Sequence, residues 1–152
     1  MRKFLVVVDD TPECGNAIRF AARRAEHTKG GLVMLYVMPR DGFEHWMGVA
    51  EVMREEAREK AEERLAEAAR HARETTDIVP EFVIREGQAV EEILSLIRED
   101  EEIGVLVLGA GEDASGPGPL VTQMVDKLGH KMPVPVTVVP GAMTHERLDQ
   151  IC

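Results

Sequence analysis

Short apolar runs alternate with longer amphipathic segments along the whole chain. The first run, Phe4 to Val8, is continuous and rich in β-branched residues, which is typical of a strand buried on both faces of a parallel sheet. Similar runs cover residues 32–38, 81–85, 105–108 and 134–139. The alternation predicts an α/β fold, a doubly wound five-stranded parallel sheet with helices on both faces.

The segments between these runs have the 3.6-residue spacing of apolar positions that predicts helices. Thr11 is the predicted N-cap of the first helix and Pro12 its first residue. The apolar face of this helix consists of Cys14, Ala17, Ile18, Ala21 and Ala25. Further helices are predicted over residues 50–73, after Gly87, and over residues 119–131. Their inward positions are Ala57, Ala61, Leu65, Ala68 and Ala72, then Val90, Ile93, Leu94 and Ile97, then Leu120, Met124, Val125 and Leu128. Residues 1–140 are predicted to form one domain, and residues 141–152 a polar, loosely attached tail.

The composition fits one globular domain. The chain has 152 residues, of which 44% are hydrophobic and 30% charged, and its net charge is −10. Such a charge repels nucleic acid, and no run of Lys and Arg offsets it. No apolar stretch is long enough to span a membrane, and the first run ends at Asp9, too early for a signal peptide. Cys14 and Cys152 fit neither a disulfide framework nor a metal site, which favours the reducing cytoplasm.

Ligands of doubly wound sheets bind beyond the carboxyl ends of the strands, where the strand order reverses. The segments to inspect are residues 9–12, 38–46, 86–88 and 109–119. Asp9 and Asp10 are candidates in the first, although capping or turn formation explains acidic residues there equally well. Gly109 lies at the expected reversal point, which favours a functional role over simple strand termination. Residues 115–119 have the composition of a mobile connector.

The sequence contains no recognisable catalytic arrangement. No nucleophile–base pair, Gly-x-Ser-x-Gly elbow or Walker loop occurs in it. The five histidines are too scattered for a zinc site. Among them, His45 is the candidate for a functional role, because it adjoins Trp46 in a loop that could reach the predicted cleft. We therefore predict a binding domain without catalytic residues of its own.

The first strand and its acidic turn resemble the start of a response-regulator receiver domain, where an acidic pair holds Mg²⁺ beside a phosphorylated Asp. That interpretation requires an Asp after the third strand and a Lys after the fifth. The chain has Arg85, Glu86 and Gly87 after the third strand, and Pro140 after the last. Both required residues are absent, so a receiver-type switch is the least favoured alternative.

The universal stress protein family resembles this chain more closely, over about residues 1–140. The resembling segments are Phe4 to Thr11, Leu35 to Met38, Gly87 to Ile93, Val105 to Gly109 and Pro135 to Val139. The resemblance implies a Rossmann-like domain of the adenine nucleotide alpha hydrolase-like kind. It also implies a regulatory role in the stress response and at most slow ATP hydrolysis.

Many members of that family bind ATP through a glycine motif after the fourth strand. The motif reads Gly, two residues, Gly, nine residues, Gly, then Ser or Thr. Its glycines let backbone N–H groups approach phosphates, and the helix that follows favours negative charge. Gly109 matches the first position, whereas Glu112, Thr122 and Gln123 stand at the other three.

The departures weaken the expected ATP site. Glu112 and Asp113 place carboxylates where phosphates would lie, and Pro117 and Pro119 lack N–H donors. The remaining glycines and hydroxyls leave room for a rearranged anion site in which Mg²⁺ bridges acid and phosphate. By resemblance, Asp9 and Val37 would contact adenine or ribose. The candidate cofactor-binding residues are Asp9, Asp10, Thr11, Val37, Gly109, Gly111, Ser115, Gly116, Gly118, Thr122 and Gln123.

The last strand is predicted to be an edge strand, because it is terminal and carries Pro133 and Pro135. An unpaired edge invites pairing with another chain, and members of the family commonly dimerise through their last strands. We predict a homodimer built on Val134 to Val139 that Val136→Lys or Val138→Lys would disrupt.

Three functions stay open. The chain is a regulatory module that binds a nucleotide, a structural dimer with a degraded site that acts through protein partners, or a receiver-type switch. Residues 109–123 discriminate between them, because a nucleotide module needs several N–H donors that converge there.

Overall fold

The computed structural model describes residues 1–40, 47–113, 115–127 and 129–152. Strands and helices alternate as β1 (Lys3–Val7), α1 (Cys14–His27), β2 (Gly31–Met38), α2 (Met47–Arg73), β3 (Glu81–Glu86), α3 (Ala89–Glu99), β4 (Ile103–Ala110), α4 (Pro119–Lys127), β5 (Val136–Pro140) and α5 (His145–Ile151). Within this part of the chain, no helix is both long and apolar enough to cross a membrane.

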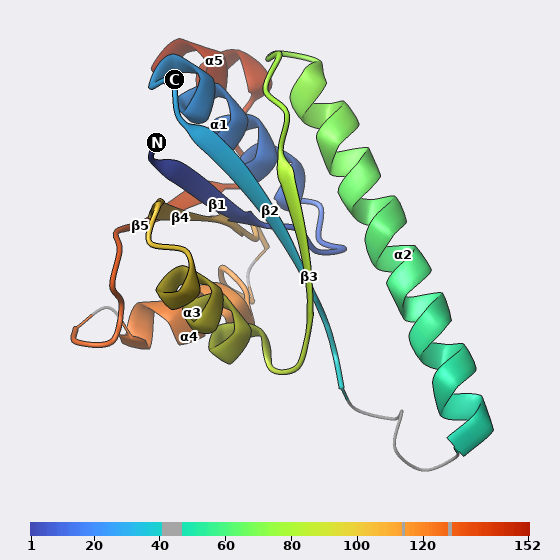
Figure 1. Ribbon diagram of the computed structural model, residues 1–152. Helices are drawn as coiled ribbons and strands as arrows, with labels where there is room; N and C mark the ends of the chain where they lie inside the picture. The colour runs from blue at the N-terminus through green and yellow to red at the C-terminus, as the bar shows by residue number, and fades with distance from the viewer. Residues whose placement is uncertain (41–46, 114, 128) are drawn as a thin grey trace.

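The five strands form one sheet in the order β3-β2-β1-β4-β5, and every neighbouring pair is parallel (Figure 1). The predicted α/β fold is confirmed, and β5 lies at an edge as predicted. The chain runs outward from β1 to β3 and then crosses back to β4, so the strand order reverses between β1 and β4. This order differs from the 2-1-3-4-5 order of flavodoxin-like receiver domains, which counts against the receiver interpretation.

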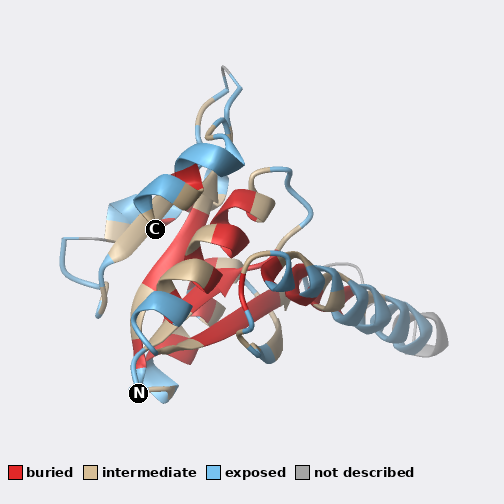
Figure 2. Cartoon of the chain, turned by 90° about the horizontal axis from the view of Figure 1, so that it is seen from above, coloured by how far each residue is buried: buried red, intermediate tan, exposed pale blue. Residues whose placement is uncertain are grey.

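Two hydrophobic layers cover the sheet, because successive side chains of a buried strand point to opposite faces. Val6 and Val8 pack with α1, α2 and α5 on one face, whereas Leu5 and Val7 pack with α3 and α4 on the other. Figure 2 shows the sheet as the buried centre of the molecule, with exposed surface along much of α2. The apolar run of β1 is continuous because both of its faces are buried.

The predicted apolar faces of the helices are largely confirmed. The stripes of α1 and α3 are buried, and in α2 so are Ala61, Leu65, Ala68 and Ala72. Cys14 is part of this core, and burial raises the pKa of its thiol to about 12. In α4, Val121 and Met124 are buried whereas Val125 is 49% exposed, so the inward assignment of Val125 is wrong. The predicted inward position Leu128 lies outside the described residues.

The start of α1 differs from the prediction. The helix begins at Cys14, its N-cap residue is Glu13, and no side chain caps it. Thr11 instead donates both its backbone N–H and its hydroxyl to Asp9 Oδ1, at 2.9 and 2.5 Å. The prediction of Thr11 as N-cap is wrong, because Thr11 closes a turn with Asp9 before the helix starts.

The segment after Pro140 is not a loosely attached tail. It contains α5, which packs on α1, and Leu148 is fully buried there. Arg19 in α1 donates two hydrogen bonds to the carboxylate of Asp149, at 2.9 and 2.8 Å. The amide of Asn16 donates to the carbonyl oxygens of Pro140, Gly141 and Met143. The prediction failed because the few apolar residues of this segment, of which Leu148 alone is buried in α5, give too weak a pattern to reveal a docked helix.

Candidate functional site

A small cavity lies where the strand order reverses. It measures about 100 Å³ and is bounded by the carboxyl ends of β1 and β4 and by the N-terminus of α4. Its lining includes Asp9, Thr11, Glu13, Gly109 and Gly118. Four of these are residues that the sequence singled out, and the exception is Glu13. The topology thus brings together the first candidate turn and the loop after β4, as expected of a switch-point site.

Asp9 holds the turn that follows β1. Its carboxylate accepts the two hydrogen bonds from Thr11, and its backbone carbonyl accepts one from Arg64 of α2 at 2.8 Å. The Asp9 side chain is therefore fixed at the rim of the cavity by its own turn. An acceptor in this position suits a hydroxyl or amino donor of a ligand.

Asp10 faces away from the cavity, toward α2. Its carboxylate lies 3.1 Å from Lys60 Nζ and 3.2 Å from Arg64 Nε, and it accepts a hydrogen bond from Tyr36 at 3.4 Å. The contact with Asp10 raises the pKa of Lys60, and burial together with Asp10 raises that of Tyr36. Among the described residues, no group of three His, Cys, Asp or Glu side chains is placed to hold a metal ion. Asp9 and Asp10 thus diverge instead of forming the acidic pair of a receiver.

Gly109 is required by packing at this point. A Cβ at this position would lie 2.6 Å from the carbonyl oxygen of Glu13 and 2.9 Å from its carbonyl carbon. Real Cβ atoms are not found so close to backbone, so the N-terminus of α1 rests directly on the end of β4. The absence of a side chain at Gly109 is therefore explained without a ligand, although Gly109 also lines the cavity.

The loop after β4 uses several of its own N–H groups. Gly111 donates to Pro117 O at 2.9 Å, and Gly116 donates to Asp113 O at 3.2 Å. The carboxylate of Asp113 accepts the backbone N–H of Ser115 at 2.8 Å and also its hydroxyl. These bonds from Ser115 lower the pKa of Asp113, so the loop carries a stable negative charge. The N–H groups of Gly111, Ser115 and Gly116 are therefore bonded within the loop and are not free for a phosphate.

Glu13 is the site residue that sequence reasoning missed. It lines both the small cavity and a neighbouring hollow of about 420 Å³ that the loop forms with Thr11 and Gly141. Its Oε1 would lie 3.4 Å from a Cβ at Gly111, so the carboxylate points at the loop. Glu112 and Asp113 line the same hollow. The only sequence signal was an acidic residue next to a helix start, which is common for electrostatic reasons.

Other candidate residues lie outside the two hollows. Val37 packs with the apolar residues between the sheet and α3 and α4. Thr122 is exposed on α4, and its hydroxyl donates to Gly118 O at 3.0 Å. Gln123 is exposed on the same helix. His45 and Trp46 lie outside the described residues.

Comparison with known proteins places this architecture in a family. Residues 1–140 match the profile of the Universal stress protein family. No curated protein matches the chain.

Solved structures of that family share the fold. Universal stress protein UspA from Lactobacillus plantarum is 21% identical, with a TM-score of 0.75 over 91% of this chain and 97% of that one. The universal stress protein from Archaeoglobus fulgidus in complex with dAMP is 17% identical, with a TM-score of 0.64 over 91% and 98%. A universal stress protein in complex with cAMP is 14% identical, with a TM-score of 0.66 over 93% and 98%. Together with the profile match, the sheet order and the switch-point cavity, these findings show that the chain belongs to the universal stress protein family.

Proposed function

We propose that this chain is a regulatory domain that binds an adenine nucleotide at the ends of β1 and β4 and catalyses no reaction of its own. The observation that carries the proposal is the cavity that Asp9, Thr11 and Gly109 form with the first turn of α4, together with the adjoining hollow of about 420 Å³, which adds the room that a nucleotide needs. Pro119 has no N–H, but the backbone N–H groups of Leu120 and Val121 in the first turn of α4 have no partner within the helix, and they favour an anion. Relatives with the same fold were solved with dAMP and with cAMP.

The site favours a nucleotide with few phosphates. Glu13, Glu112 and Asp113 surround the hollow next to the cavity, and like charges repel one another. Each added phosphate brings more negative charge toward these carboxylates, and the loop offers few free N–H donors in return. We expect AMP to bind more tightly than ATP, and Mg²⁺ to improve ATP binding because it offsets the charge of the phosphates.

Isothermal titration with AMP, ADP and ATP tests this order. Asp113→Asn removes one charge from the loop and is expected to raise the affinity for ATP by about two- to fivefold, with little effect on AMP. Asp77→Asn removes another exposed carboxylate, which lies before the amino end of β3 at the other end of the sheet, and we expect no change with either nucleotide. Tighter binding of ATP than of AMP in the absence of Mg²⁺ would contradict the proposed charge effect.

A structural scaffold is the second candidate function. It is favoured by the internal hydrogen bonds of Gly111, Ser115 and Gly116, which leave the loop complete without a ligand. In that case the domain would act through protein partners alone. The titration separates the two functions, since a scaffold gives no heat with millimolar AMP.

We also propose that the chain forms a homodimer through the free edge of β5. Pro135 O accepts a hydrogen bond from Leu106 N, and Gly141 N donates one to Ala110 O. The backbone N–H and C=O groups of odd-numbered residues in β5 therefore point toward β4. The backbone groups of Val136 and Val138 therefore point to the open edge, where a second β5 could pair with them. Their side chains pack against the core next to α3 and α4, so a lysine at either position would disturb the core as well as the edge.

Val138→Pro is a sharper test of this dimer. Proline removes one N–H that points outward, and we expect light scattering to show a dimeric wild-type chain and a monomeric variant. The matched control is Ile84→Pro in β3, the opposite edge, which is expected to stay dimeric. There Gly87 N donates to Met38 O, so the backbone of even-numbered residues faces outward in the same way. A monomeric wild type, or dimers of both variants, would rule out this interface.

The cytoplasm is the compartment that we propose. Cys14 and Cys152 are both unpaired, and Cys14 is buried. Free thiols persist most readily in a reducing environment.

A further inference from the structure

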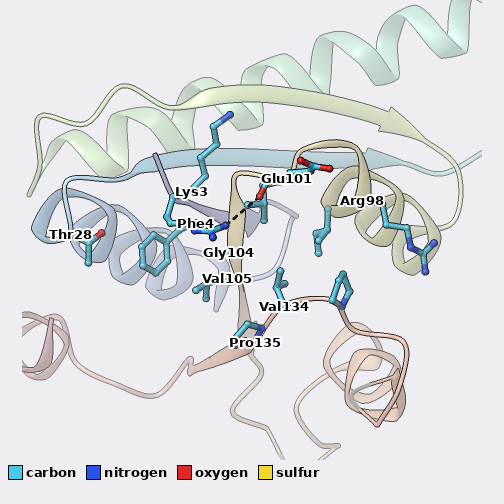
Figure 3. A pocket seen from close by; sticks show the side chains of 13 residues that line it. Lys3, Phe4, Thr28, Arg98, Glu101, Gly104, Val105, Val134 and Pro135 are labelled. Carbon is cyan, nitrogen blue, oxygen red and sulfur yellow. Dashed lines mark hydrogen bonds between the residues drawn. The ribbon is translucent and has the colours of Figure 1, made fainter.

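A second cavity lies at the end of the sheet opposite the proposed nucleotide site. It measures about 810 Å³ and is formed at the amino ends of β1 and β4 and by the segment that leads into β5. Figure 3 shows Phe4 and Thr28 on one side of it, Arg98 on the other, and Val134 and Pro135 along its lower wall. The proposed nucleotide function does not use this cavity.

Two features of the sequence form this cavity, which we call the notch. First, β4 begins at Ile103, but β5 begins only at Val136, which pairs with Leu106. Pro133 and Pro135 have no N–H to extend that pairing. Second, Ile103 pairs with Lys3 and Val105 with Phe4, so Gly104 between them is a bulged residue without a partner on β1. Bulges of this kind often occur beside binding sites.

The walls of the notch are apolar. Phe4 and Val105 reach it from the layer under α1, and Ile97 and Val134 reach it from the layer under α3 and α4. Gly104 contributes only backbone to the floor. An apolar cavity of this size matches the volume of known small-molecule sites.

The basic residues around the notch differ in how their charges are used. Lys3 is neutralised, because its ammonium lies 2.9 Å from Glu81, 2.9 Å from Asp100 and 3.3 Å from Glu102. These carboxylates raise its pKa further.

Arg2 and Arg98 have no carboxylate within ion-pair distance in the described part of the chain. Arg2 donates only to the backbone carbonyl of Glu101, at 3.4 Å. Arg98 stands in the last turn of α3, where the helix carbonyls favour a cation. Glu101 also lines the notch, so its one carboxylate stands against two arginines that form no ion pair among the described residues. The notch therefore combines apolar walls with a net positive rim, on a molecule whose net charge is −10.

We propose that this notch binds a small amphipathic anion, with its apolar body against Phe4, Val105 and Val134 and its acid group beside Arg2. The ligand class is a hydrophobic carboxylate, which complements both the apolar walls and the positive rim. The site is independent of the nucleotide cleft, since the two lie at opposite ends of the strands.

Calorimetric titration of the full chain with decanoate tests the proposal, with decanol as the uncharged ligand of the same length. Gly104→Leu fills the notch: the nearest atom to a Cβ there is the flexible Arg2 Cδ at 3.4 Å, and Gly104 does not have a positive φ. We expect the affinity of this variant for decanoate to fall by at least about tenfold, because the new side chain occupies the apolar part of the notch. Gly129→Leu, at a glycine with open space around it, should bind like the wild type.

The charge requirement is tested separately. Arg2→Ser is expected to weaken decanoate binding by about two- to fivefold and to leave decanol unaffected. Arg70→Ser removes an exposed arginine on α2 and is the matched control. Equal affinity of the wild type for decanoate and decanol would overturn the proposal, and so would unchanged decanoate binding by Arg2→Ser. If Gly104→Leu does not fold, the arginine variants and the decanol comparison still decide the question.

Discussion

Gly109→Ala is expected to lower the free energy of unfolding by about 2–3 kcal/mol, although it adds a single methyl group. The new Cβ in β4 would meet the carbonyl oxygen of Glu13, the N-cap residue of α1, at 2.6 Å. To relieve this close contact, α1 would have to move away from β4, and this movement would loosen the core on that face of the sheet. Urea denaturation followed by circular dichroism measures the change.

Gly111→Ala is the matched control, two residues further along the chain. A Cβ there would lie 3.4 Å from Glu13 Oε1 and from Gly116 O, and the residue does not have a positive φ. We expect a change below about 1 kcal/mol. If both variants were equally stable, the close approach of α1 to β4 would be wrong. The pair also shows why a bulkier residue at Gly109 is a poor test of ligand binding, since it would remove the site by disturbing the fold.

Leu148→Ala is expected to cost about 2–3 kcal/mol, because it removes a fully buried side chain from the contact between α5 and α1. The effect is predicted to be local at first: amide exchange in α5 should accelerate before the sheet unfolds. Ile151→Ala in the same helix is the control, since that side chain is 46% exposed, and it should change stability little. If Leu148→Ala changed neither the free energy of unfolding nor amide exchange in α5, then α5 would not be docked on α1 in solution.

The docking of α5 is also expected to depend on pH. The contact with Arg19 holds the pKa of Asp149 below its ordinary value of 3.8. A lowered carboxyl pKa stabilises the folded state at any pH above the unfolded value, and this contribution is lost as the pH falls through the folded-state value. Asp149→Asn should remove the dependence, which amide exchange of α5 between neutral and strongly acidic pH would detect.

Much of the fold could be predicted from the sequence because buried parallel strands are continuous apolar runs. Phe4 to Val8 reads as a strand buried on both faces, and in the structure its residues alternate between the two hydrophobic layers. Leu148 illustrates the limit. Asn16 and Arg19, which lie more than a hundred residues earlier, bond to Pro140 and Asp149 on either side of Leu148, and no local sequence pattern shows these contacts.

The candidate site was predictable only in its location. The strand order places Asp9 and Gly109 together, and the sequence anticipated that much. The direction of the Asp10 side chain depends on Lys60 and Arg64, which come from the middle of α2. The contact between Gly109 and Glu13 depends on how closely α1 approaches β4, and no sequence motif reports that distance.

A nitrogen-15 NMR titration with AMP decides whether a nucleotide binds at the ends of β1 and β4. We expect saturable shifts of the amide signals of Thr11, Gly109, Gly118 and Val121, which line the switch-point cavity. The signals of Gly104 and Val105, at the opposite end of β4, should stay in place. No shift at millimolar AMP, or shifts confined to the other end of the sheet, would contradict a nucleotide site at the ends of β1 and β4.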